Sequence, residues 1–176
     1  MPDLARTWCH GHARAQSTRL PGTAKTAIHA LEPIVNLARL LIRNGDGQDA
    51  LHLLHTLFEA VINQTDTEVD SGLVVPGAEL TTTEEEHQTV VRWVWKVLLA
   101  DGTRALTTAG RWTQALEHLR AHNGIGNRMG DGRQVAVLAH LVTGEPDKAH
   151  ALVEATTPAK PWVEAVTAFL GALCRP

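Results

Sequence analysis

A short motif recurs in this chain: a glycine is followed five residues later by an alanine that opens an apolar run. It occurs at Gly45–Ala50, Gly110–Ala115 and Gly144–Ala149, and each time one amphipathic stretch precedes the glycine and another follows the alanine. Gly110 and Gly144 are 34 residues apart, and Gly45 and Gly110 are 65 apart, close to twice that period. Such a period is typical of helix–turn–helix repeats. The motif therefore predicts an all-α fold of paired antiparallel helices with a glycine at each turn.

The composition agrees with a helical globular protein. The 176 residues are 44% hydrophobic and 20% charged, Tyr is absent and Phe occurs twice, while Ala and Leu are abundant. These preferences favour helix over sheet, and the length predicts a single main domain over residues 23–176. The net charge of −3 argues against a general nucleic-acid binder, which is basic overall or on one face.

The sequence also bears on the cellular location of the protein. No window reaches the ~18 apolar residues of a membrane span, and the N-terminus lacks the apolar core of a signal peptide. Cys9 and Cys174 form no disulfide framework. We therefore expect a cytoplasmic protein without membrane or nucleic-acid partners. Twelve arginines against four lysines, with abundant Ala, indicate a bacterial source of high GC content.

Apolar residues at helical spacing predict most of the chain as helix. Residues 1–22 form either a loose arm or a docked helix with Leu4, Trp8 and Cys9 on its apolar side. Pro33 favours a short helix before it and a second helix starting at it, rather than one kinked helix. The remaining helices are expected at 33–43, 46–63, 82–110, 112–122, 135–143, 146–155 and 161–174.

Two segments break the helical pattern. Residues 64–82 contain Pro76-Gly77 and a short extended run at Leu73-Val74-Val75. Structureless connections longer than about 12–15 residues are often functional, although an ordinary surface insertion is an equally simple interpretation. Residues 123–132 hold four glycines and predict a flexible turn.

The repeated motif resembles the tetratricopeptide repeat family. The matching residues are Leu37, Ala38, Leu41, Gly45, Ala50 and Leu54 in the first helix pair, Gly110, Ala115 and Leu119 in the second, and Gly144, Ala149 and Val153 in the third. The resemblance covers about residues 31–157, apart from 64–82. It implies a stack of helix pairs, an α-solenoid with a right-handed superhelix, that the last helix caps.

The repeats depart from the family pattern at several positions. Leu41, Leu106 and His140 stand where the family commonly has Tyr, and Thr103 and Val137 replace its small residue. The repeats are therefore degenerate versions of the family motif.

The resemblance implies a concave surface that binds a peptide or protein partner, so the protein would act as a scaffold or regulator. It places these candidate contacts there: Val35, Asn36, Arg39, Ile42, Arg43, Val97, Arg104, Gln134, Leu138 and Leu141. Three arginines beside apolar positions suit an acidic, partly apolar peptide; the alternative is that they are merely solvated. As exposed charges they are expected to contribute little to stability.

No enzyme signature is present, and we expect no metal or cofactor. Cys9-His10-x-His12 has metal-ligand residue types, but no second group of ligands at zinc-site spacing accompanies it. The pairs His118/His122 and His52/His55 lack the glutamate of an H-E-x-x-H motif. Neither a phosphate-binding loop nor a nucleophile elbow occurs. A catalytic pocket assembled from scattered residues is not excluded by this absence.

Two other functions compete with the interaction module. The first is a small-molecule-binding protein or accessory enzyme of a bacterial biosynthetic pathway, in which 64–82 covers a pocket containing Trp93 or Trp95. A deep closed pocket favours it, whereas an open groove favours the interaction module. The second is a self-associating homo-oligomer, which requires an exposed apolar patch on the last helix.

Overall fold

The computed structural model describes residues 2–158 and 160–175, which form eight α-helices and one two-stranded sheet. The contacts divide the chain into two compact units, Met1–Ala105 and Leu106–Pro176. Each unit has its own apolar cluster of buried side chains. The all-α fold class is confirmed, and the boundary between the units falls inside a helix of the region expected to form one domain. Within the described residues, no helix combines the length and the apolar character needed to span a bilayer.

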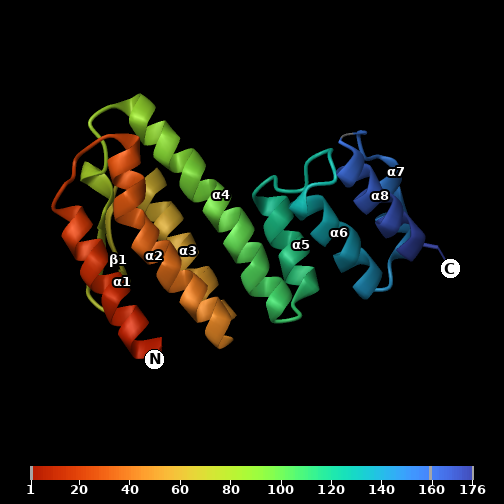
Figure 1. Cartoon of the computed structure of the whole chain (residues 1–176), viewed down its shortest axis with the longest axis horizontal. Coiled ribbons are helices and arrows are strands. Elements are labelled where there is room, and N and C mark those ends of the chain that lie inside the picture. Colours follow the sequence, from red (N-terminus) through yellow and green to blue (C-terminus); the bar gives the residue numbers. More distant parts are fainter. Residues whose placement is uncertain (1, 159, 176) are drawn as a thin grey trace. The chain divides into compact units, whose positions relative to one another are not determined.

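In the first unit, α1 (Pro2–Ser17), α2 (Ala24–Asn44) and α3 (Gly47–Ile62) lie side by side (Figure 1). Helix α4 (Glu84–Thr108) contributes Val90, Val94 and Leu98 to their common core. The Thr83 side chain accepts a hydrogen bond from the Glu86 amide, which makes Thr83 the N-cap of α4. Of the two interpretations of residues 1–22, the structure shows the docked helix.

The second unit contains α5 (Trp112–Ala121), α6 (Asp131–Val142), α7 (Pro146–Glu154) and α8 (Pro161–Leu173). Consecutive helices pack against one another, α5 on α6, α6 on α7 and α7 on α8 (Figure 1). Pro146 and Pro161 occupy the first turns of their helices, where the missing amide proton costs no hydrogen bond. The predicted bounds of α5, α7 and α8 lie within one residue of the observed ones, whereas α6 begins four residues before its predicted start at 135.

The three motif glycines occupy the same kind of turn. Gly45, Gly110 and Gly144 have φ values of +92°, +70° and +75°. After each one, the next residue donates its amide to the carbonyl five positions earlier, at 2.9 Å from Asp46 to Leu41, 2.9 Å from Arg111 to Leu106 and 2.8 Å from Glu145 to His140. This geometry ends a helix in the left-handed region that favours glycine. The prediction that these glycines lie at turns between helices is confirmed.

The prediction of two helices around Pro33 is wrong, because α2 continues through it as one helix. Pro33 cannot donate an amide to the carbonyl four residues earlier, which costs the helix one hydrogen bond. Leu31 on one side of it and Ile34 and Leu37 on the other are each 1–2% exposed and belong to the same core. Burial of this continuous apolar row outweighs the lost hydrogen bond.

The segment 64–82 is a docked hairpin. Strand β1 (Asp66–Asp70) pairs antiparallel with β2 (Leu73–Pro76), and a short 3-10 turn, η1 (Gly77–Glu79), follows. Ser71 and Gly72 between the strands have φ values of +34° and +76°, as a tight two-residue hairpin requires. Leu73 and Val75 are buried, and the hairpin packs against α3 and α1.

Residues 123–132, expected to form a flexible turn, are held by specific contacts. Arg133 is 6% exposed and donates to the carbonyls of Gly126 and Leu152. The Thr157 amide donates to the Asn127 carbonyl at 2.8 Å, and Met129 is fully buried. Gly132 allows a close backbone approach, since a Cβ there would lie 2.1 Å from the Gly124 carbonyl oxygen.

Candidate binding groove

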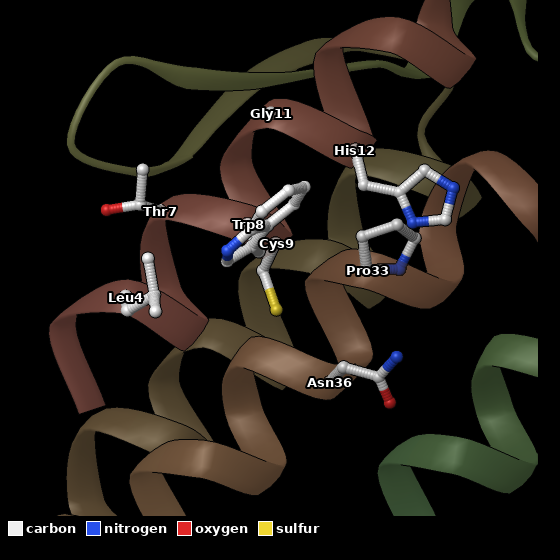
Figure 2. A pocket seen from close by; sticks show the side chains of 8 residues that line it. All are labelled: Leu4, Thr7, Trp8, Cys9, Gly11, His12, Pro33 and Asn36. Carbon is white, nitrogen blue, oxygen red and sulfur yellow. The ribbon is translucent and has the colours of Figure 1, made fainter. Parts of the chain in front are cut away.

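An open groove of about 760 Å³ lies between α1 and α2. Figure 2 shows the side chains that line it, six of them from α1 and two from α2. The lining is mainly apolar, with a few polar groups and no Asp, Glu, Lys or Arg side chain. Its residues are Leu4, Thr7, Trp8, Cys9, Gly11, His12, Pro33 and Asn36.

The α1 wall follows from helical spacing. Leu4, Trp8 and Gly11 are separated by four and three residues, so they share one face of the helix. Leu4 is 57% exposed and Trp8 is 71% exposed. A Cβ added to Gly11 would meet no atom within 4 Å, so the space beside it is empty. Two large apolar side chains and a gap therefore present a surface that nothing in the described chain covers.

The expectation that Leu4 and Trp8 face the core is wrong. The side of α1 that meets the protein carries smaller side chains, with Ala13 1% exposed and Cys9 partly buried against the core. These small residues allow α1 to lie close to α2, and the large residues are left on the open side.

Charged hydrogen bonds hold α1 to the hairpin. Asp70, at the end of β1, accepts a hydrogen bond from Arg6, and its other oxygen is 2.8 Å from Nε2 of His10. Burial alone would raise the pKa of Asp70, but the hydrogen bond from His10 and the charge of Arg6 lower it below its usual value. The ionised carboxylate therefore fixes the α1 wall of the groove.

Cys9 gives the groove a thiol in a partly apolar setting. Burial raises the pKa of Cys9 above its ordinary value. A raised pKa keeps the sulfur protonated near neutral pH, so it acts as a small apolar side chain rather than a nucleophile.

The ten predicted contact residues do not share this groove. Asn36 lines it. Val35 and Val97 are 1% and 8% exposed and belong to the core of the first unit, while Ile42 packs against that core. Arg43 is exposed at the end of α2. Leu138 and Leu141 pack against the core of the second unit, and the Gln134 amide donates to the Met129 carbonyl at 3.2 Å.

Two of the three predicted arginines already pair with a carboxylate of this chain. Asp101 on α4 is 3% exposed, and its two oxygens lie 2.9 Å from Nε of Arg39 and 3.5 Å from a terminal nitrogen of Arg104. Arg39 also donates to the Asn36 side chain at 3.4 Å, next to the groove. The side chains of Arg39 and Arg104 are therefore solvent-exposed and also paired with Asp101.

In the described part of the chain, Cys9, His10 and His12 do not form one cluster of metal ligands. His12 and Cys9 line the groove while His10 is bound to Asp70, so the Cys9-His10-x-His12 residues have different neighbours. The rings of His118 and His122 lie side by side with centroids 4.7 Å apart and a tilt of 59°. Burial lowers the pKa of His55, an effect that Glu59 opposes and His52 reinforces.

Sequence reasoning missed seven of the eight groove residues. The sequence indicates that Leu4 and Trp8 share a helix face with Cys9, but not that Leu4 and Trp8 line a groove with Gly11. Which side of α1 faces the protein depends on Ala13 and on the contact with Asp70, 60 residues beyond His10.

Comparison of the chain with family models, with curated proteins and with solved structures finds no match.

Proposed function

We propose that this protein is an interaction module that binds a segment of another protein in the groove between α1 and α2. The observation that carries the proposal is the exposure of Leu4 and Trp8 beside the empty space at Gly11. Exposed apolar patches on soluble proteins mark interaction sites when they are contiguous, and Trp is among the residues enriched at binding hot spots. A bulky apolar side chain of the partner would occupy the space next to Gly11.

The openness of the groove favours a protein partner over a small molecule. Its volume of about 760 Å³ lies within the range of small-molecule sites. Those sites bury most of their ligand, however, whereas Trp8 on this wall is 71% exposed and His12 is exposed too. The hairpin of 64–82 packs against α1 and α3, and Trp93 packs against the core of its unit. These contacts give the lidded-pocket alternative no support.

The charges beside the groove favour an acidic residue in the partner segment. Arg39 contacts Asn36 at one end of the groove and is paired with Asp101. Asp101 orients the Arg39 guanidinium group, so a carboxylate of the partner would meet a donor that is already positioned. The partner segment we propose thus combines an apolar anchor with an acidic neighbour.

The repeated glycine turns support a degenerate tetratricopeptide-type scaffold as the framework for this module. Three turns with the same hydrogen bonds and the same following alanine are what such a repeat needs locally. The superhelical stacking of the helix pairs is part of this proposal.

The test is a peptide-display selection against the full chain, with random peptides as the probe. We expect the enriched peptides to share a bulky apolar residue with an acidic neighbour. Their binding should fall at least tenfold for Gly11→Phe, because the added side chain occupies the groove. A Cβ at Gly11 meets no atom within 4 Å, so the substitution creates no clash at that atom. Trp8→Ala should weaken binding by a similar factor, in keeping with the loss of a hot-spot aromatic.

Two controls separate a blocked groove from a disturbed fold. Gly11→Ala adds only a methyl group and should bind like the wild type. Val74→Phe adds comparable bulk to an exposed strand position outside the groove and should also bind normally. Peptides that bind Gly11→Phe and the wild type equally would overturn the proposal.

A further inference from the structure

Helix α8 exposes a second apolar surface, in the other unit of the chain. Trp162, Phe169 and Leu173 are 62%, 64% and 47% exposed. The adjacent side of the helix buries Val163, Leu170 and the following Cys174 in the core with α7. Glu164 is the one charged residue between Pro161 and Leu173. The exposed side of α8 therefore offers apolar surface that is not needed to fold its own unit.

The exposed residues follow a heptad seam that alternates large and small side chains. Trp162, Ala165, Phe169 and Ala172 are separated by three, four and three residues, the spacing that places side chains along one line of a paired helix. Ala165 and Ala172 are exposed, like the aromatic residues between them. A helix that packs on this seam must fit a bulky residue, a gap, a bulky residue and a gap in that order.

A second copy of α8 fits this order when it runs antiparallel. In that arrangement Trp162 lies opposite Ala172 of the other copy, and Phe169 lies opposite Ala165 of the other copy. Every layer then pairs one large with one small side chain, and each contact occurs twice about a two-fold axis. A two-fold interface requires a surface that is complementary to itself. We propose that two copies of this chain associate through their α8 helices in this antiparallel register.

The charges and the available area agree with a weak dimer. Glu164 lies two residues after Trp162 and so off the seam, which means that pairing buries no charge at the four layers. Trp162 and Phe169 can each still bury on the order of 100 Å². A standard stable interface needs about 800 Å² per partner, and α8 alone supplies less. The dimer should therefore form reversibly at high micromolar concentration rather than be permanent.

Sedimentation equilibrium of the full chain, from about 10 μM to about 1 mM, measures the association constant. Exchanging the residues at positions 162 and 172 then tests the register. Trp162→Ala removes the large residue from two layers, and Ala172→Trp places two tryptophans in each of those layers. Each single variant should weaken association more than about tenfold. The double variant, Trp162→Ala with Ala172→Trp, restores one large and one small residue in every layer and should recover the wild-type constant to within about threefold.

The exchange distinguishes specific pairing from apolar adhesion. Nonspecific adhesion would make Ala172→Trp associate more strongly than the wild type, and this result would overturn the proposal. A wild-type chain that stays monomeric to about 1 mM would also overturn the proposal. So would a double variant that associates no more strongly than either single variant. Glu164→Gln, off the seam, is the matched control and should dimerise normally. All substituted positions are exposed, so helicity and melting temperature should remain those of the wild type.

Discussion

Replacement of the turn glycines by alanine tests the repeat at its most specific feature. Gly45, Gly110 and Gly144 have φ between +70° and +92°, and a Cβ at any of them would meet no atom within 4 Å. The cost of Gly→Ala at these positions is therefore backbone strain alone, about 1–2 kcal/mol. The smaller entropy of the unfolded alanine chain offsets about 0.4–1 kcal/mol of it. We expect a net loss of about 1 kcal/mol in the free energy of unfolding at each site.

Equilibrium urea unfolding followed by circular dichroism measures this loss, with a separate transition fitted to each unit if two appear. Gly→Asn should cost less than Gly→Ala at the same sites, because Asn tolerates the left-handed region better. Gly11→Ala is the matched control. It lies inside α1 with open space around it, so alanine should stabilise by about 0.5–1 kcal/mol. Three alanine variants as stable as the wild type would refute the strain argument.

Three further predictions concern packing and charge. Ala149→Leu should destabilise by about 1–3 kcal/mol in chemical denaturation, because Ala149 is fully buried between α7 and its neighbours. Arg39→Glu should destabilise the protein more than Arg39→Ala does, because it places a second carboxylate next to buried Asp101. A denaturation midpoint of Arg39→Glu equal to that of the wild type would contradict the pairing. The pKa of Asp70 is lowered in the fold, so its contribution to stability is present above the unfolded pKa of about 3.8 and is lost as the pH falls through the folded value. Melting curves from pH 6 to pH 2 should show this loss in the wild type and not in Asp70→Asn.

The local features of the fold could be predicted from the sequence because they depend on nearby residues. A glycine at the end of an apolar row requires the left-handed turn that Gly45, Gly110 and Gly144 all adopt. Pro146 and Pro161 likewise mark helix starts, because a proline in the first turn loses no hydrogen bond.

The missed features depend on distant contacts. Pro33 lowers helix stability locally, and only the shared core of α2 decides that the helix continues. Strand β2 coincides with the extended run expected at Leu73-Val74-Val75, but its pairing with β1 through the two-residue turn at Ser71-Gly72 was not predicted. The groove was missed because the sequence shows that α1 has an apolar row but not that Ala13 and Asp70 turn that row outward. Asp101 was overlooked for a similar reason, because the Arg39 partner is 62 residues away along the chain.

The most direct test of the proposed groove is the indole N–H signal of Trp8 in the NMR spectrum of the full chain. The five tryptophans give five such signals, and Trp8→Phe assigns the one from the groove. On titration with a peptide from the display selection, we expect the Trp8 signal to shift with the peptide's binding curve while that of Trp162, on α8, stays in place. A saturating peptide that leaves the Trp8 signal unmoved would contradict the proposal that the α1–α2 groove is the binding site.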